Sequence, residues 1–367
     1  MRYYIIAGEA SGDLHGSGLV RELRIADSSA VFRAWGGDKM EAAGAPLVKH
    51  YRDLAFMGFV EVVKHLGTIL KNIKFAKSDI LSFKPDVLIL IDYPGFNLRI
   101  AKWAKEQGIR VVYYISPQVW AWKEGRAKAI KRDVDQMLVI LPFEVDFYKK
   151  WGMEVAYVGH PLVEVVDTAR KSGLPAKLGV TGKPLIALLP GSREQEIRTK
   201  LPIMLSVVDA FPDYEFAVAM APSQGESLYR EVAGGKPITL VAGQTYELLR
   251  QSRAALVTSG TATLETALFG VPQIVCYKGH PASYWLAKKL IKVKYISLVN
   301  LILDRPVVPE LIQDDLNTER LIQELQKLLP EESTDRRHMQ ECYAELWNLL
   351  GSRRASERTV ELILKKL

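Results

Sequence analysis

A turn of small residues lies between a short apolar run and a helical pattern in the second half of the chain. Residues 255–257 predict a buried parallel strand, and apolar spacing over 264–268 predicts a helix. The turn contains Ser259, Gly260, Thr261, Ala262 and Thr263. Because the first N–H groups of a helix lack partners and carry the positive end of its dipole, the turn is suited to bind phosphate. A capped connection that binds nothing is equally compatible, since a single glycine turn is a weak signal.

Charged residues near this turn are suited to the other parts of a nucleotide. The carboxylate of Glu265 would repel phosphate, so we expect it to accept hydrogen bonds from ribose hydroxyls. Ser192 and Arg193 follow the apolar run 185–189 and should reach the same edge of the predicted sheet. The planar guanidinium of Arg193 fits a pyrophosphate, and a surface ion pair with Glu196 is the alternative.

Acidic residues also follow strands in the first half of the chain. Asp92 comes directly after the apolar run 87–91. Ligands of open α/β sheets bind at the carboxyl ends of strands, so Asp92 is placed for acid–base chemistry, although it could equally cap the next helix. The glycine-containing turn 8–13 follows the strand 3–7, but it does not match the dinucleotide pattern G-x-G-x-x-G.

Strands and helices alternate in two series joined by a linker rich in Gly, Pro and Lys at 170–184. Alternation of this kind predicts an α/β fold with a parallel sheet in each half. The expected strands are 3–7, 31–35, 87–91, 110–115, 136–141 and 155–158 in the first series, and 185–189, 215–220, 238–241, 255–257 and 273–276 in the second.

Composition limits the class of protein without choosing a ligand. The 367 residues suggest two domains, and 48% hydrophobic with 25% charged residues indicate a globular chain. Lys and Arg number 49 against 42 for Asp and Glu, and this net charge of +7 suits nucleotides, sugar phosphates, acidic lipid head groups or nucleic acid. No nucleic-acid-binding module is recognisable. The two cysteines, Cys276 and Cys342, form no disulfide framework and favour a reducing compartment.

One basic amphipathic stretch is compatible with a membrane surface. The sequence enters a strand at its start without a signal-peptide pattern, and no apolar run approaches the roughly 18 residues of a spanning helix, so we expect a cytoplasmic protein. Within 54–77, the apolar residues Val63, Leu66 and Leu70 fall at helical spacing, with Lys64, Lys71 and Lys74 among them. This pattern fits a helix lying on an anionic bilayer, and it fits still better a core-facing helix with a solvated basic face.

A series of short motifs, in order along the chain, resembles the lipid-A-disaccharide synthase family. They are GEASGD at 8–13, MG at 57–58 with EV at 61–62, IDYPGFN at 91–97, SPQVWAW at 116–122, LPFE at 141–144, GHP at 159–161, LPGSR at 189–193 and SGTATLE at 259–265. The resemblance extends to about Gln313 and departs at Val299, where the family usually has Pro before Asn300. It implies the GT-B fold, in which two Rossmann-like domains face each other across a cleft.

The resemblance also implies domain limits and a reaction. The expected domains are 1–170 for the acceptor and membrane side, 171–340 for the UDP-sugar side, and a C-terminal helix at 341–367 that packs back on the first domain. The implied enzyme is an inverting hexosyltransferase with no metal or other cofactor. UDP-2,3-diacylglucosamine would donate its sugar to the 6-hydroxyl of 2,3-diacylglucosamine 1-phosphate, giving a β-1,6 disaccharide 1-phosphate and UDP.

The resemblance assigns roles to individual residues. Asp92 would take the acceptor proton, with Glu9 as the second candidate, and Arg193 would stabilise the leaving UDP together with the Ser259–Thr263 turn. The other substrate-binding residues implied are Ser11, Gly12, Asp13, Asn97, Ser192, Glu265, Asn300, Glu310 and Gln313.

Other implications and alternatives remain open at this stage. Because both substrates carry acyl chains, the family favours peripheral contact of 54–77 with the cytoplasmic face of the inner membrane, and a homo-oligomer is compatible with it. The alternative enzymes are a UDP-N-acetylglucosamine 2-epimerase or another GT-B enzyme, which would turn over a UDP-sugar without a lipid acceptor. A basic nucleic-acid-binding protein is the alternative outside enzymes.

Overall fold

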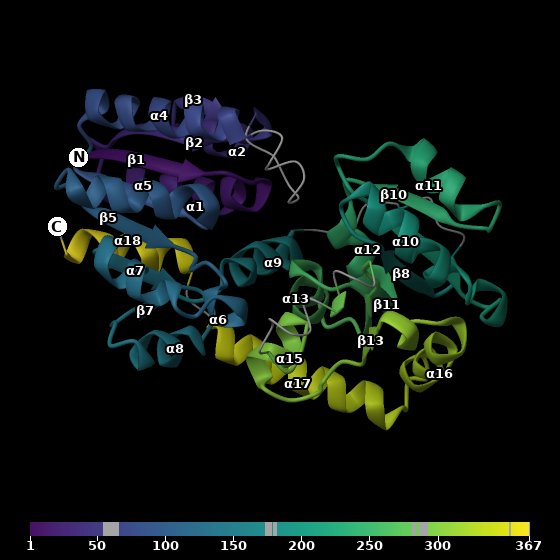
Figure 1. The fold of residues 1–367 in the computed structure, drawn as a ribbon. Helices are drawn as coiled ribbons and strands as arrows, with labels where there is room; N and C mark the ends of the chain where they lie inside the picture. Colours follow the sequence, from purple (N-terminus) through teal and green to yellow (C-terminus); the bar gives the residue numbers. More distant parts are fainter. Residues whose placement is uncertain are drawn as a thin grey trace. The chain divides into compact units, whose positions relative to one another are not determined.

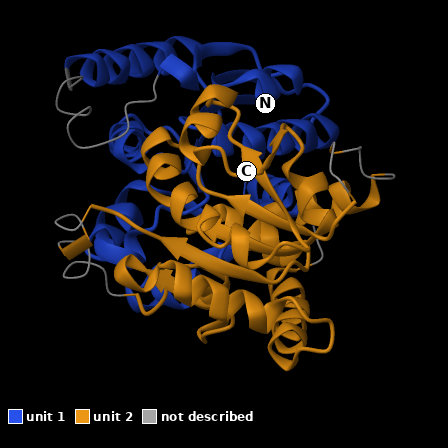
Figure 2. Ribbon diagram, turned by 90° about the vertical axis from the view of Figure 1, so that its right-hand side faces the viewer, with its two compact units in different colours: residues 1–161, 352–367 blue, residues 162–351 orange. Residues whose placement is uncertain are grey.

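The chain folds into two compact α/β units, each of which is described by itself. The computed structural model describes residues 1–53, 66–172, 178, 182–280, 284–285, 293–351 and 354–366. Unit 1 comprises Met1–Pro161 and Ser352–Leu367, and unit 2 comprises Leu162–Gly351 (Figure 2). Both contain a parallel sheet with alternating helices, which confirms the predicted fold class.

Unit 1 is built on a sheet that, in the described part of the chain, has seven parallel strands (Figure 1). The strands are β1 (Arg2–Ala7), β2 (Val31–Gly36), β3 (Leu47–His50), β4 (Val87–Ile91), β5 (Val111–Tyr114), β6 (Gln136–Val139) and β7 (Ala156–Tyr157), in the order β3-β2-β1-β4-β5-β6-β7. The chain moves outward from β1 to one edge and then from β4 to the other. The boundary between β1 and β4 is therefore a topological switch point, where open α/β sheets bind ligands.

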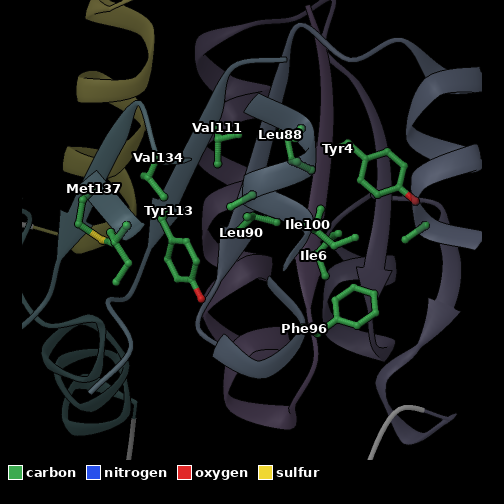
Figure 3. Packing of buried hydrophobic residues seen from close by; sticks show 14 of the residues in the cluster. Tyr4, Ile6, Leu88, Leu90, Phe96, Ile100, Val111, Tyr113, Val134 and Met137 are labelled. Carbon is green, nitrogen blue, oxygen red and sulfur yellow. The ribbon is translucent and has the colours of Figure 1, made fainter. Parts of the chain in front are cut away.

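The helices of unit 1 cover this sheet and enclose its core. They are α1 (Ala10–Ala26), α2 (Asp38–Ala42), α4 (Leu66–Phe83), α5 (Pro94–Glu106), α6 (Val119–Trp122), α7 (Arg126–Asp133), α8 (Glu144–Lys150) and α18 (Ala355–Lys365), with a 3₁₀ turn at Tyr51–Asp53. Figure 3 shows part of the core, in which Leu88 and Leu90 of β4 lie among Ile6, Ile100 and Tyr113. Every residue of β4 is buried. Its sequence is a continuous apolar run because the strand lies in the middle of a covered parallel sheet.

Unit 2 repeats the plan with a sheet that has six strands within the described ranges. They are β8 (Leu185–Leu189), β9 (Glu215–Met220), β10 (Thr239–Ala242), β11 (Ser252–Thr258), β12 (Gln273–Tyr277) and β13 (Glu310–Ile312), in the order β10-β9-β8-β11-β12-β13. The α-helices are α9 (Pro161–Lys171), α10 (Glu194–Leu205), α11 (Glu226–Ala233), α12 (Thr245–Gln251), α13 (Thr261–Leu268), α15 (Leu298–Leu303), α16 (Thr318–Leu328) and α17 (Thr334–Leu350), and 3₁₀ turns span Val208–Ala210 and Gln313–Asp315. Its switch point lies between β8 and β11.

The limits of the two units depend on contacts that cannot be predicted from the composition of the linker. Helix α9 belongs to unit 2, where Arg250 donates hydrogen bonds to the carbonyl oxygens of Ala169 and Ser172 at 3.3 and 3.0 Å. The units therefore divide after Pro161, ahead of the limit of 170 expected from the sequence. All of α17 also stays in unit 2, so the segment that belongs to unit 1 begins at Ser352 and not at 341.

The last helix, α18, packs against α1 within unit 1. Val360 and Ile363 of α18 are buried, and the side-chain amide of Gln136 donates to the carbonyl oxygen of Leu362 at 2.9 Å. The Arg354 guanidinium lies 3.3 Å from the carboxylate of Glu22 on α1. Figure 1 shows this yellow helix beside the elements drawn from the beginning of the chain.

Helix α5 begins close to the site, and two short strands extend the sheets at their edges. Helix α5 begins at Pro94, two positions after Asp92. Proline suits the first helical position because its missing N–H has no acceptor there. The short strands β3 and β13 were not anticipated. In the described residues, no helix is long and apolar enough to cross a membrane.

Candidate active site

Two acidic residues of unit 1 lie at the carboxyl ends of neighbouring strands. Glu9 follows β1 and Asp92 follows β4, and these strands pair in parallel with Ala7 opposite Ile91. The two carboxylates are therefore at the same edge of the sheet, at the switch point of unit 1. The sequence prediction that Asp92 stands at a strand end is confirmed by this register.

The backbone at Asp92 is strained and held by specific hydrogen bonds. Asp92 and Tyr93 have φ angles of 44° and 49°, in the left-handed region that residues other than glycine seldom adopt. The carbonyl oxygen of Asp92 accepts hydrogen bonds from Asn97 Nδ2 at 2.8 Å and from the Tyr113 hydroxyl at 2.5 Å. Such a conformation costs about 1–3 kcal/mol per residue and persists where surrounding contacts fix it, frequently at functional sites.

Burial raises the pKa of the Asp92 carboxyl into a range that suits a general base. The pKa of Asp92 is raised to about 6, first by burial and then by the negative charge of Glu9. At pH 7 the group is mostly ionised, yet it is a stronger base than an ordinary aspartate. This combination suits proton removal from a hydroxyl.

Glycines let the chain approach closely around this edge. A Cβ at Gly8 would lie 2.3 Å from the ring of Tyr93, so the ring could not occupy its position beside any other residue. Gly12, predicted as a substrate contact, is buried, and a Cβ there would lie 3.0 Å from that of Ala7. Gly12 therefore allows α1 to pack closely on β1, while Ser11 in the first turn of α1 is exposed.

Asp13 and Asn97, two of the predicted substrate contacts, have structural partners. The Asp13 carboxylate is 3% exposed and accepts from the backbone N–H groups of Gly37, Lys39 and Met40 at 2.8, 3.2 and 3.0 Å. It caps the first turn of α2, as acidic side chains do at helix N-termini. Asn97 is completely buried and uses its amide to hold Asp92, so it acts through that residue.

Unit 2 presents two loops at its own switch point. Ser192 and Arg193 follow β8, and the turn that contains Ser259 and Gly260 follows β11. Strands β8 and β11 are neighbours, with Leu189 opposite Val257. The prediction that both loops reach one strand-end edge is confirmed.

The turn after β11 offers fewer N–H groups than its sequence suggested. Both the N–H and the hydroxyl of Thr263 donate to the carbonyl oxygen of Gly260, at 3.1 and 2.8 Å. The Ser259 hydroxyl donates to Ile296 O at 2.8 Å. At the N-terminus of α13, the N–H groups of Thr261 and Ala262 have no intrahelical acceptor. Gly260, with a φ of 149°, lies before them in a conformation that side chains disfavour.

The loop after β8 is organised by Glu196. Its Oε2 accepts from the N–H groups of Ser192 and Arg193 at 3.1 and 3.3 Å. The Arg193 guanidinium is 3.9 Å from the other carboxylate oxygen, Oε1, and its side chain is 63% exposed. The ion pair considered from the sequence is therefore present but long, and the guanidinium remains accessible to an anion.

Glu265 is placed as a hydrogen-bond acceptor on α13. The Tyr246 hydroxyl donates to its Oε1 at 2.7 Å, and burial raises the pKa of its carboxyl. The second oxygen can accept from a sugar hydroxyl. Tyr246 was missed in the sequence analysis because its contact with Glu265 joins two successive helices across β11, which residue spacing does not reveal.

Three other residues predicted to contact the nucleotide form hydrogen bonds within the segment that follows β12. Asn300 is 1% exposed, and its amide donates to Val308 O and Glu310 Oε1, both at 2.9 Å. Glu310 also accepts from the N–H groups of Ile296 and Ser297 at 3.0 and 2.9 Å. Gln313 accepts from the N–H of Gly279 at 2.7 Å. These side chains hold the loops of this segment in place.

The predicted membrane residues are only partly described. Val63, Lys64 and the side chain of Leu66 lie outside the described part of the chain. Leu70 is 53% exposed, and Lys71 and Lys74 are exposed beside it on α4. Among the described residues, no cluster of three or more His, Cys, Asp or Glu side chains could hold a metal ion.

Comparison with known proteins gives one family over nearly the whole chain. The family model described as Lipid-A-disaccharide synthetase matches residues 3–364. The lipid-A-disaccharide synthase of Geobacter sulfurreducens is 39% identical over 374 aligned residues, which cover 100% of this chain and 97% of the relative.

Solved structures share the fold at low sequence identity. The UDP-GlcNAc 2-epimerase from Neisseria meningitidis, bound to UDP-GlcNAc, has a TM-score of 0.66 and 11% identity, covering 100% of this chain and 99% of its own. The glycotransferase of kitacinnamycin has a TM-score of 0.65 and 14% identity, with the same coverage of 100% and 99%. These similarities confirm the GT-B fold class, and the epimerase considered from the sequence is a distant structural neighbour only.

Proposed function

Because this chain belongs to the lipid-A-disaccharide synthase family, we propose that it transfers 2,3-diacylglucosamine from UDP to the 6-hydroxyl of 2,3-diacylglucosamine 1-phosphate. The products are a tetra-acyl disaccharide 1-phosphate with a β-1,6 link and UDP. Inversion at the anomeric carbon requires a base on the attacking hydroxyl and no covalent intermediate on the protein.

Asp92 is the base in this proposal, and its environment is the observation that carries it. The carboxyl has a pKa of about 6, stands at the switch point of unit 1 and is fixed through its own carbonyl oxygen. A positioned base of this strength typically contributes 10²–10⁴ in rate. Glu9, next to it on the same edge, positions the acceptor and is the second candidate for the base.

Unit 2 binds the donor in this proposal. Arg193 and the N–H groups of Thr261 and Ala262 stabilise the negative charge that develops on the departing diphosphate. Glu265 accepts a hydrogen bond from the ribose, as acidic residues do beside nucleotide-binding helices. Support comes from the neighbouring positions of these groups at the ends of β8 and β11.

The exposed side of α4 is the proposed contact with an anionic membrane. Ile73, Ala76 and Ile80 bury one side of this helix, which leaves Leu70, Lys71 and Lys74 at the surface. An apolar residue flanked by lysines suits the interface of an acidic bilayer. Such a location, on the cytoplasmic face of the inner membrane, would bring the enzyme to its acylated substrates.

The test is release of UDP from the purified chain with both acylated substrates. We expect UDP to appear only when the acceptor is present, and turnover of the donor without acceptor would instead support an epimerase. Asp92→Asn should lower turnover by at least a hundredfold while UDP binding is retained. If Asp92→Asn keeps near-normal turnover while Glu9→Gln is inactive, the base is Glu9.

A further inference from the structure

A buried lysine lies behind the loop that follows β8. Lys200 is on the second turn of α10 and is only 2% exposed. Its ammonium is 3.9 Å from Oε1 of Glu196, one helical turn closer to the loop. Side chains of an α-helix lean toward its N-terminus, so the ammonium points back to the strand-end edge of the sheet.

Other groups around Lys200 indicate that it lies near the β8 loop and near strand β12. Its pKa is lowered chiefly by burial, while the negative Glu196 and the Cys276 thiol raise it and Arg193 lowers it. Cys276 is at the end of β12, in register with Thr258, which directly precedes the Ser259 turn. The lysine thus interacts with residues of the β8 loop and of the strand beside β11.

The edge also contains a polar atom with no protein partner. The hydroxyl of Thr258 is buried, with the residue 6% exposed, and no group in the described part of the chain bonds to it. Buried hydroxyls are almost always satisfied, so Thr258 is an exception next to the switch point of unit 2.

Glu196 creates an electrostatic conflict that Lys200 resolves. The loop needs the carboxylate, because it accepts from the N–H groups of Ser192 and Arg193. Gly191 also fits this carboxylate closely, since a Cβ at its φ of 120° would lie 2.5 Å from Oε2. A negative charge beside a diphosphate site would repel the ligand unless a cation neutralises it.

We propose that Lys200 is a positioning residue for the donor diphosphate: it neutralises Glu196 from the buried side, so that the Ser192–Arg193 loop keeps its shape without repelling the anion. The proposal rests on the assignment of UDP to this edge of unit 2. Lys200 itself is too buried to contact the ligand, so its effect is exerted through the charge and geometry of the loop.

The test compares ligands with and without phosphate. We expect Lys200→Met to weaken UDP binding about tenfold in calorimetry, since a charge in a poorly solvated site is left uncompensated. Binding of uridine, which lacks the diphosphate, should change less than twofold. Equal weakening of both ligands would mean that Lys200 supports the fold alone and would overturn the proposal, as would unchanged UDP binding.

A second variant separates charge from folding. Glu196→Gln added to Lys200→Met removes the uncompensated charge and keeps an oxygen for the loop N–H groups, so UDP affinity should recover to within about threefold of the wild type. No recovery would contradict the proposal. Arg198→Met removes an exposed cation from the same helix, where it pairs with Glu194 and Glu231, and serves as the matched control with little expected effect.

The UDP-binding measurement distinguishes the donor assignment from the role proposed for Lys200. If the wild-type chain does not bind UDP, the donor assignment fails and the role of Lys200 fails with it. If the wild type binds UDP and Lys200→Met binds it equally well, the donor assignment stands and only the role of Lys200 is wrong.

Discussion

At the scale of the residue, Asp92 shows why some site residues are predictable and others are not. Asp92 follows a strand whose every side chain is apolar, so its place at the sheet edge can be inferred from sequence. Asp13 belongs to the same kind of turn, but its carboxylate is taken up by N–H groups some 24 to 27 positions away. Which carboxylate is left for a substrate depends on such distant partners, which spacing does not reveal.

The acidity of Asp92 predicts the pH dependence of catalysis. Because its pKa is about 6, kcat/KM should fall close to tenfold per pH unit below pH 6, as the base becomes protonated. Initial rates from pH 4.5 to 8 test this. The buried Glu144, whose pKa is raised by burial to about 7, provides the control. Glu144→Gln should keep the fall below pH 6, and its loss in that variant would assign the fall to Glu144.

The raised pKa of Asp92 also predicts that its ionised carboxylate lowers the stability of the folded chain. A carboxyl with a pKa near 6 in the folded chain and near 4 when unfolded binds its proton more tightly in the folded state. Stability therefore decreases as pH rises from about 4 to 6 and stays reduced above this range. An asparagine side chain cannot ionise, so Asp92→Asn should be more stable than the wild type by about 1–3 kcal/mol at pH 7.5, with the gain shrinking toward pH 4. Urea unfolding at both pH values measures the difference, and a less stable variant at pH 7.5 would contradict it.

At the scale of the element, apolar runs identify the central strands but not the edges. The expected strands 87–91, 185–189 and 215–220 agree with β4, β8 and β9 at both ends. Strands β3 and β13 are short, half-buried edge strands without a sustained apolar run, so no periodic pattern distinguishes them from loops. The edges do not carry the switch points, so their omission did not change the expected positions of Asp92 and of the Ser259 turn at strand ends.

Helix α4 carries the prediction on membrane contact. Lys71→Glu with Lys74→Glu should weaken binding to vesicles rich in acidic lipid by at least tenfold, because each lysine near such a surface contributes about 1 kcal/mol. Cosedimentation measures the change. Lys149→Glu with Lys150→Glu, two exposed positions on α8, makes the same change in net charge and is the control. An equal loss in both variants would show that overall charge, and not α4, governs binding.

At the scale of the whole molecule, the sequence predicts two α/β halves but not the course of the chain between them. The Gly, Pro and Lys density near 170–184 marks a linker, yet α9 joins unit 2 through Arg250, whose carbonyl partners lie about 80 positions earlier. The final segment similarly divides after α17, since its last helix completes the core of unit 1. Composition indicates where a chain is flexible or polar, whereas membership of a core depends on which apolar faces meet.

The stability of unit 1 depends on α18, which comes from the far end of the chain. Ile363 on α18 is fully buried, so Ile363→Ala should destabilise unit 1 by about 2–5 kcal/mol. Lys365→Ala, at an exposed position two residues later, should have little effect. Because Ile363 lies outside unit 2, UDP binding measured well below the unfolding temperature should be unchanged, whereas catalysis should be lost on heating earlier than in the wild type. Loss of UDP binding in the folded Ile363→Ala variant would contradict the assignment of donor binding to unit 2 alone.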